Sequence, residues 1–391
     1  MKFAISDQIR AVHPPPISEV KGWLAGREPD PARPLIDLCQ AVPDYAPARQ
    51  MVDYLAACLD DPTMAKYSPD EGLPEVREAV CARYGRVYGA GPAPEEVCLT
   101  IGASQAFWLA MVTLCRAGDE VIVPLPAYFD HPMALEMLGI RPVWLPFDEE
   151  RGGVIDPAAV ERLITPRTRA ILLVSPSNPT GVVTLPDVIH ELYALARRRG
   201  TALVIDETYS DFIPGGPAPH DLFADPHWGD HLVQIMSFGK TYALTGYRAG
   251  CLVASEEFIG HALKAQDTMA VCQPRITQHA ILYGVRHLDD WVAENRLMME
   301  RRHDLFRSLF AGRGNPFELA ASGTFFAWVR HPLKGREGRE AARRLAVEAG
   351  VISLPGEVFG PGLEPYLRLA FGNIREEEIP GAVERFRSFA V

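Results

Sequence analysis

The chain has 391 residues, of which 48% are hydrophobic and 23% are charged, enough for a large globular core. Its formal net charge of -11 argues against nucleic acid or an anionic membrane as the main partner. The N-terminus has no apolar targeting segment, and no apolar run reaches membrane-spanning length. These properties predict a cytoplasmic protein that binds neither nucleic acid nor membrane.

The cysteines are scattered along the chain, odd in number, and never in C-x-x-C spacing. They are Cys39, Cys58, Cys81, Cys98, Cys115, Cys251 and Cys272. This pattern is typical of reduced, mostly buried thiols, and it predicts neither a metal site nor a disulfide framework.

The first part of the chain divides into an arm and a long α/β segment. Residues 1–45 are proline-rich and predict an N-terminal arm, followed by a large domain over 46–285. Within that domain, short apolar runs alternate with amphipathic stretches, as expected for a mostly parallel sheet flanked by helices. The predicted strands are 97–101, 120–124, 170–175, 202–207, 232–238 and 251–255, with helices at 103–115 and 186–199.

The pattern changes beyond residue 285. A long helix over 291–310 leads to the apolar run "FFAWV", a charged helix over 337–349, the run "YLRLAF" and a last helix. We therefore expect a smaller α+β domain over 286–391, so that the fold class is α/β with a second, smaller domain.

Unusual polar residues follow the predicted strands, where open α/β sheets bind ligands. A helix opens at Gly102, Ala103 and Ser104, and small residues there let backbone N–H groups meet an anion. The residues that follow the later strands are Tyr128, Asn178, Asp206, Tyr209, Ser237, Lys240 and Arg248.

Each of these residues also has an ordinary structural explanation. Gly102–Ser104 alone is better read as a simple helix start, "SNPTG" is a good turn sequence, and Lys240 could be a solvated loop lysine. Their recurrence at successive strand ends of one sheet is hard to ascribe to chance.

A single ligand could bind all of these residues that follow the predicted strands. A phosphate would suit the helix start with Ser237 and Arg248, and an aromatic ring would stack on Tyr128. A basic ring nitrogen would pair with Asp206, and an aldehyde would be captured by Lys240 as a Schiff base. Asn178 and Tyr209 would bond a ring oxygen. These demands together indicate pyridoxal 5′-phosphate.

The chain resembles the class I/II aminotransferases of the fold-type I pyridoxal-phosphate family over nearly its whole length. The matching stretches are "YSPDEGLPEVREAV", "GASQAF", "SPSNPTG", "IDETYSDF", "SFGKTYALTGYRAG" and "SLPGEVFG…YLRLAF". The resemblance implies that Lys240 is the cofactor lysine and proton shuttle, and that Tyr128 stacks on the ring. It also implies that Arg368 binds the substrate carboxylate as a bidentate fork, and that Tyr67 serves the cofactor phosphate of a partner subunit in a homodimer.

Three positions bear on the substrate. Ala41 stands where the family often has glycine, and its methyl group could narrow the pocket. Ser104 replaces a basic residue that some dicarboxylate-specific relatives carry, which weakens the case for aspartate. Arg275 could bind a side-chain carboxylate or make only an interface contact, and we favour the contact.

The expected reaction is a ping-pong transfer of an amino group from an α-amino acid to a 2-oxo acid. Lys240 should have a depressed pKa, because Arg248 and an apolar surround disfavour its charge. The main alternative is a lyase or cyclase on the same scaffold, which would share every cofactor residue. A cofactor-sensing DNA-binding regulator is a weaker alternative, because the arm has no room for a DNA-binding segment.

Overall fold

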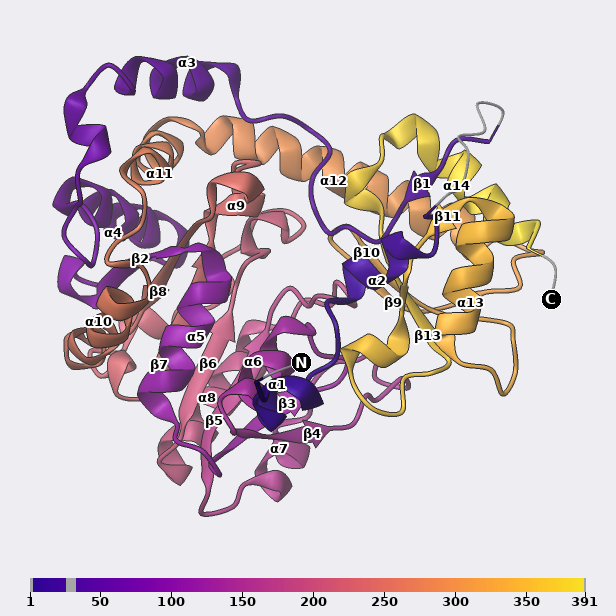
Figure 1. The fold of residues 1–391 in the computed structure, drawn as a ribbon, viewed down its shortest axis with the longest axis horizontal. Coiled ribbons are helices and arrows are strands. Elements are labelled where there is room, and N and C mark those ends of the chain that lie inside the picture. Colours follow the sequence, from indigo (N-terminus) through magenta and orange to yellow (C-terminus); the bar gives the residue numbers. More distant parts are fainter. Residues whose placement is uncertain (1–2, 26–32, 390–391) are drawn as a thin grey trace.

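The computed structural model describes residues 3–25 and 33–389. The chain forms a large α/β part and a smaller part built on antiparallel strands, and the long helix α12 (Asp289–Phe310) runs from one to the other (Figure 1). Among the described residues, no helix combines the length and apolar character needed to cross a bilayer.

The large part is organised around a seven-stranded sheet with the order β2-β8-β7-β6-β5-β3-β4. Strand β8 is antiparallel to both of its neighbours, and the other pairings are parallel. The strands are β2 (Val97–Ile101), β3 (Glu120–Pro124), β4 (Arg141–Leu145), β5 (Thr168–Val174), β6 (Ala202–Asp206), β7 (Leu232–Ser237) and β8 (Ala249–Val253).

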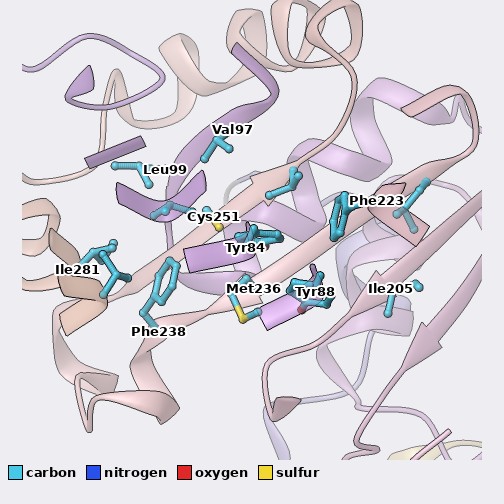
Figure 2. Close-up of a cluster of buried hydrophobic side chains, with 14 of the residues drawn as sticks. Tyr84, Tyr88, Val97, Leu99, Ile205, Phe223, Met236, Phe238, Cys251 and Ile281 are labelled. Atoms are coloured by element: carbon cyan, nitrogen blue, oxygen red, sulfur yellow. The ribbon is translucent and has the colours of Figure 1, made fainter. Parts of the chain in front are cut away.

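Helices cover both faces of this sheet, and successive residues of a strand enter different hydrophobic clusters. Leu203 packs with residues of α4, α8 and α11, whereas the next residue, Val204, packs with α5, α6 and α10. Figure 2 shows the first cluster, in which Tyr84 and Tyr88 of α4 lie against Met236 and Cys251 of the sheet. These helices are α4 (Pro74–Tyr88), α5 (Gly102–Leu114), α6 (Asp130–Met137), α8 (Pro186–Arg199), α10 (Glu256–Ala270) and α11 (Arg275–His287). The large part also contains α3 (Arg49–Cys58), α7 (Pro157–Leu163) and the one-turn helix α9 (Phe238–Thr241).

The smaller part contains a four-stranded antiparallel sheet with the order β12-β13-β10-β9. Its core is rich in aromatic residues, and the rings of Phe306 and Phe371 stack with centroids 4.5 Å apart. Its elements are β9 (Glu318–Gly323), β10 (Phe326–Arg330), α13 (Gly338–Arg344), β11 (Val351–Ile352), β12 (Leu354–Pro355), β13 (Tyr366–Ala370) and α14 (Ile379–Arg387).

The N-terminal arm joins the smaller part, because β1 (Ile36–Asp37) pairs in parallel with β11. The arm also forms two short helices, α1 (Asp7–Ala11) and α2 (Pro16–Gly22), which the sequence did not indicate. Proline is tolerated in the first turn of a helix, and Pro16 occupies that position in α2. Residues 1–2 and 26–32 of the predicted arm, and 390–391 of the predicted smaller domain, lie outside the described residues.

The α/β architecture predicted from the sequence is confirmed, and the six predicted strands all occur in the large sheet. Strand β4 was not predicted from the sequence; it is partly exposed, and its "RPVWL" sequence includes a proline. The charged helix predicted over 337–349 begins as α13 and ends as a π-helical turn over Leu345–Ala349.

Candidate active site

A cavity of about 470 Å³ lies where the sheet, the start of α5, the N-terminal arm and the smaller part meet. It brings together most of the residues singled out from the sequence. Those that line it are Ala41, Ala103, Ser104, Tyr128, Asn178, Asp206, Tyr209, Ser237, Lys240, Arg248 and Arg368. Gly102 lies directly behind this lining, and Tyr67 lies elsewhere on the surface of the chain.

The start of α5 and Arg248 form one end of the cavity. Gly102 has a φ of 72°, and a Cβ atom there would lie 2.6 Å from Nη2 of Arg248, so only glycine lets the guanidinium come this close. Ser237 is also in the lining, and its Oγ accepts a hydrogen bond from the backbone N–H of Gly239 at 3.2 Å, leaving the hydroxyl hydrogen to donate elsewhere. A helix N-terminus, a hydroxyl and a guanidinium together suit an anion.

Asp206 ends strand β6 inside the cavity, buried beside His131. Its Oδ2 lies 3.2 Å from Nε2 of His131, and its Oδ1 accepts from the backbone N–H of Thr208 at 3.0 Å. Burial opposes the charge on Asp206, but the interactions with His131 and Thr208 outweigh burial and hold the pKa of Asp206 below its usual range. Asp206 is therefore a carboxylate at neutral pH.

Lys240 reaches into the cavity from α9. Burial, followed by the positive charges of Arg368 and Arg248, lowers the pKa of Lys240 to about 8. The lowered pKa agrees with the expectation from the sequence. The Nζ atom donates a hydrogen bond of 2.6 Å to the backbone carbonyl of Ala41, so the arm closes over the amine. At neutral pH a fraction of this amine is unprotonated and nucleophilic.

Arg368 lies on the other side of the cavity, on β13. Its Nη1 donates to Oδ1 of Asn178 at 3.1 Å, and its Nη2 donates to the carbonyl of Cys39. Asn178 in turn donates from Nδ2 to the hydroxyl of Tyr209 at 3.4 Å, and burial raises the pKa of Tyr209, which keeps that hydroxyl protonated.

Arg368 is 1% exposed, yet no carboxylate of the described residues pairs with its guanidinium, and its Nε has no hydrogen-bond partner there. Buried charges in proteins are normally paired. An arginine in this condition is suited to bind the carboxylate of a ligand.

Sequence reasoning missed several residues of the site. His131 contacts Asp206, and its ring packs on Phe107 with centroids 4.2 Å apart. Asp130 lines the cavity and accepts a hydrogen bond from the hydroxyl of Tyr128 at 2.6 Å. Asp130 and His131 lie two and three residues after Tyr128 in "AYFDHP", and this closeness to a candidate residue was the only sequence signal for them. The other lining residues that the sequence did not indicate are mostly apolar: Ile17, Val42, Phe107, Trp108, Phe129, Met133, Ala134, Met137 and Val174, with the polar Gln40 and Thr208.

Tyr67 and Arg275 lie together outside the cavity. Tyr67 is 76% exposed on a loop, and Arg275 donates from Nε to the carbonyl of Lys66 at 3.0 Å and from Nη2 to the carbonyl of Tyr67 at 2.8 Å. In this chain the guanidinium of Arg275 therefore anchors the loop that carries Tyr67.

Comparison with known families gives this geometry its context. A family model described as aminotransferase class I and II matches residues 33–386. The chain belongs to this family. Its members use pyridoxal phosphate, and the chain is accordingly a pyridoxal-phosphate-dependent transaminase of the fold-type I architecture.

Similar proteins carry two kinds of name, aromatic aminotransferase and aspartate aminotransferase. An aromatic aminotransferase of Arabidopsis thaliana is 29% identical over 90% of this chain and 89% of its own length. An aspartate aminotransferase of Pyrococcus abyssi is 27% identical over 96% of this chain and 95% of its own. The structure of Thermus thermophilus aspartate aminotransferase with maleate is 28% identical, covers 98% of this chain and 99% of its own, and superposes with a TM-score of 0.89. The lyase or cyclase alternative is not favoured by these relatives.

The residues of the cavity fit the family's cofactor. The buried carboxylate of Asp206 suits a protonated ring nitrogen, and the buried amine of Lys240 suits an aldehyde. The guanidinium of Arg248, which has no ion-pair partner in the described part of the chain, lies at the helix start beside Gly102 and suits a phosphate.

Proposed function

We propose that this aminotransferase takes its amino group from an α-amino acid with a large, uncharged side chain and passes it to a 2-oxo acid in two half-reactions. The observation that carries the proposal is the distribution of charge in the cavity. Its lysine and two arginines are each suited to another task. The other lining residues are apolar or uncharged polar, apart from the carboxylates of Asp130 and Asp206 and the imidazole of His131, which pairs with Asp206.

The cofactor would be held by residues at successive strand ends. Lys240 would hold its aldehyde carbon, Asp206 its ring nitrogen, and Tyr128 one face of its ring. Asn178 and Tyr209 would bond the ring hydroxyl, and the phosphate would lie against the backbone of Gly102, Ala103 and Ser104 with Ser237 and Arg248. When bound, pyridoxal phosphate supplies a carbonyl that accepts amino groups and a ring that withdraws electrons from the substrate.

Lys240 carries the proton in this proposal. An amine with a pKa of about 8 is roughly one-tenth unprotonated at pH 7, whereas an ordinary lysine is almost fully protonated there. Nζ of Lys240 would accept a proton from the α-carbon of the substrate and later return one. A base whose pKa lies near the working pH is well matched to this exchange.

Arg368 would bind the α-carboxylate of the substrate. Its buried guanidinium already donates to the neutral acceptors Asn178 and Cys39, and a carboxylate would give it the charged partner that it lacks. Because burial lowers the pKa of Arg368, an anion beside it should be bound favourably.

The apolar wall and Asp130 then select the side chain. Trp108, Met133 and Met137 offer apolar contact to a large group. A second carboxylate would find no cation left among the described residues of the cavity and would approach the carboxylate of Asp130. Arg275, the other candidate for a side-chain carboxylate, is occupied with the carbonyls of Lys66 and Tyr67.

The test compares phenylalanine with aspartate as the amino donor by measuring kcat/KM for each. We expect phenylalanine to be preferred. Asp130→Asn should raise kcat/KM for aspartate about fivefold relative to phenylalanine, because two partly screened like charges repel by about 1 kcal/mol. Glu136→Gln, which removes a charge from the exposed side of the same helix, is the matched control and should leave the ratio unchanged. A wild-type preference for aspartate would contradict the proposal.

We further propose that the working unit is a cytoplasmic homodimer. Tyr67 is bulky, exposed and held on an anchored loop, as expected of a residue that completes a partner's site. The seven cysteines are all unpaired, which suits a reducing compartment.

A further inference from the structure

A buried ion pair lies directly behind the turn that carries Lys240. Arg83 on α4 pairs through Nη2 with Oδ1 of Asp211, and the side chains of Arg83 and Asp211 are 5% and 13% exposed. The second carboxylate oxygen, Oδ2, accepts a hydrogen bond of 2.6 Å from the hydroxyl of Thr241, the residue next to Lys240. Asp211 therefore connects Arg83 to the α9 turn.

Asp211 belongs to the segment that presents the other cofactor residues. It lies in a short 3-10 helix (Ser210–Phe212), which follows Asp206 and Tyr209 in the chain. The hydrogen bond from Thr241 thus joins the segment that ends β6 to the segment that follows β7. One segment carries the carboxylate for the ring nitrogen, and the other carries the amine.

The α9 turn needs such a support. It has four residues, too few for a helix to be stable on its own. Two non-glycine residues that follow it, Ala243 and Arg248, have φ angles of 56° and 59°, a backbone region that is unfavourable for residues with a Cβ. Contacts with the rest of the fold must therefore hold this part of the chain in place.

Several features make the bond through Asp211 a strong contact of this kind. It is charge-assisted, and Thr241 is 2% exposed, so little water competes with it. Burial opposes the charge on Arg83, but Asp211 and the nearby tyrosine hydroxyls together outweigh burial and raise the pKa of Arg83, which keeps the guanidinium charged. Asp211 is not among the residues that line the cavity, so it is not placed to take part in the chemistry directly.

We propose that Asp211, held by Arg83, is a positioning residue: through the hydroxyl of Thr241 it fixes the α9 turn and so sets the place of the Lys240 amine relative to Asp206. The inference rests on the role proposed for Lys240, which Lys240→Ala tests separately by abolishing turnover. Misplacing a reacting group by about 1 Å can cost on the order of 100-fold in rate.

The decisive variants are Thr241→Val, which removes the hydroxyl at nearly constant volume, and Thr241→Ser, which restores it. With whichever of phenylalanine or aspartate reacts faster, Thr241→Val should lower kcat at least about tenfold with little change in KM, and Thr241→Ser should recover most of the loss. Asp211→Asn keeps an acceptor for Thr241 but weakens the pair with Arg83, and it should show an intermediate loss.

A second measurement separates positioning from stability. In cofactor-free protein, the rate at which acetic anhydride modifies Lys240 at different pH values reports the pKa of its amine. Thr241→Val should move the midpoint upward from about 8, because a loosened amine is less buried. Thr168→Val is the matched control. Thr168 is also buried, and its hydroxyl accepts a hydrogen bond from the N–H of Thr165 at 2.9 Å. It is the first residue of β5, at the end of the strand opposite to the site.

Thr168→Val should lower the free energy of unfolding without changing kcat or the pH midpoint of Lys240 acetylation. The proposal is overturned if Thr241→Val lowers only the free energy of unfolding, as Thr168→Val does. It is also overturned if Thr241→Ser is as slow as Thr241→Val, because the hydroxyl would then not be the cause. If Thr241→Val does not fold, the proposal is tested with Asp211→Asn and Thr241→Ser, by the same measurements of kcat and of the pH midpoint of Lys240 acetylation.

Discussion

Lys240 donates a hydrogen bond of 2.6 Å from Nζ to the backbone carbonyl of Ala41, a residue 199 positions earlier in the chain. The amine at the centre of the site therefore contacts the N-terminal arm. Arg368 makes the same kind of contact with the carbonyl of Cys39, two residues before Ala41. The arm thus helps to cover both cationic groups, and burial is the largest cause that lowers the pKa of each.

The lowered pKa of Lys240 gives the first prediction. In cofactor-free protein, acetylation of Lys240 should increase with pH to a midpoint of about 8, measured by peptide mass spectrometry against a small lysine peptide. An ordinary lysine has a midpoint of about 10.4. Arg368→Gln should move the midpoint of Lys240 upward, because it removes a positive charge that disfavours the ammonium form. A wild-type midpoint above pH 10 would show that the amine is not in the environment described.

The contact between Asp206 and His131 gives the second prediction. Asp206→Asn should retain the fold but lower kcat on the order of 100-fold, as is typical when one preorganised charge is removed from an active site. His131→Phe keeps an aromatic ring against Phe107 but removes the interaction that lowers the pKa of Asp206. The carboxylate should then become protonated at a higher pH, so the acid limb of the kcat profile should move upward. An unchanged acid limb in His131→Phe would remove His131 from this role.

Arg368 provides the third prediction. Arg368→Lys keeps the charge but loses the planar two-point grip on a carboxylate, and hydrogen bonds to charged groups contribute about 1.5–3 kcal/mol. We expect kcat/KM for the amino donor to fall roughly 10- to 100-fold. The dissociation constant of pyridoxal phosphate, measured by absorbance titration, should change little. Equal losses for donor and cofactor would mean that the variant disturbs the whole cavity.

The sequence predicted those parts of the site that follow strands. Asp206 and Lys240 come directly after buried apolar runs, and the carboxyl ends of such strands meet at one edge of a sheet. Arg368 was found only because its motif resembles that of a family, since it is 190 positions from its partner Asn178 and nothing local indicates that the two are in contact.

The features that the sequence did not reveal depend on tertiary packing. Asp130 and His131 are adjacent, and only the position of α6 against the sheet decides that both of them line the cavity. The support of Thr241 by Asp211 joins two segments whose order in the chain gives no sign of the contact. Strand β4 was missed because its burial is partial and its pattern is interrupted by proline.

The last prediction concerns the exposed ring of Tyr67. Its loop is held from within the same chain, by Arg275 through the carbonyls of Lys66 and Tyr67, so the ring is presented outward rather than left free to collapse onto its own surface. If the ring completes the phosphate site of a partner, Tyr67→Ala should lower activity at least about tenfold through weaker cofactor binding. Arg275→Gln should produce a milder loss of the same kind, because it loosens the loop without removing the ring.

Subunit exchange tests the arrangement directly. A Lys240→Ala chain retains Tyr67, and a Tyr67→Ala chain retains Lys240, so a mixed dimer contains one site with both residues intact and one site with neither. Random exchange makes half of the dimers mixed, and mixing the two weak variants should therefore restore about a quarter of wild-type activity. If Tyr67 instead acted within its own chain, no intact site would form and mixing would restore nothing. Sedimentation of the active protein as a monomer would equally rule out the shared site.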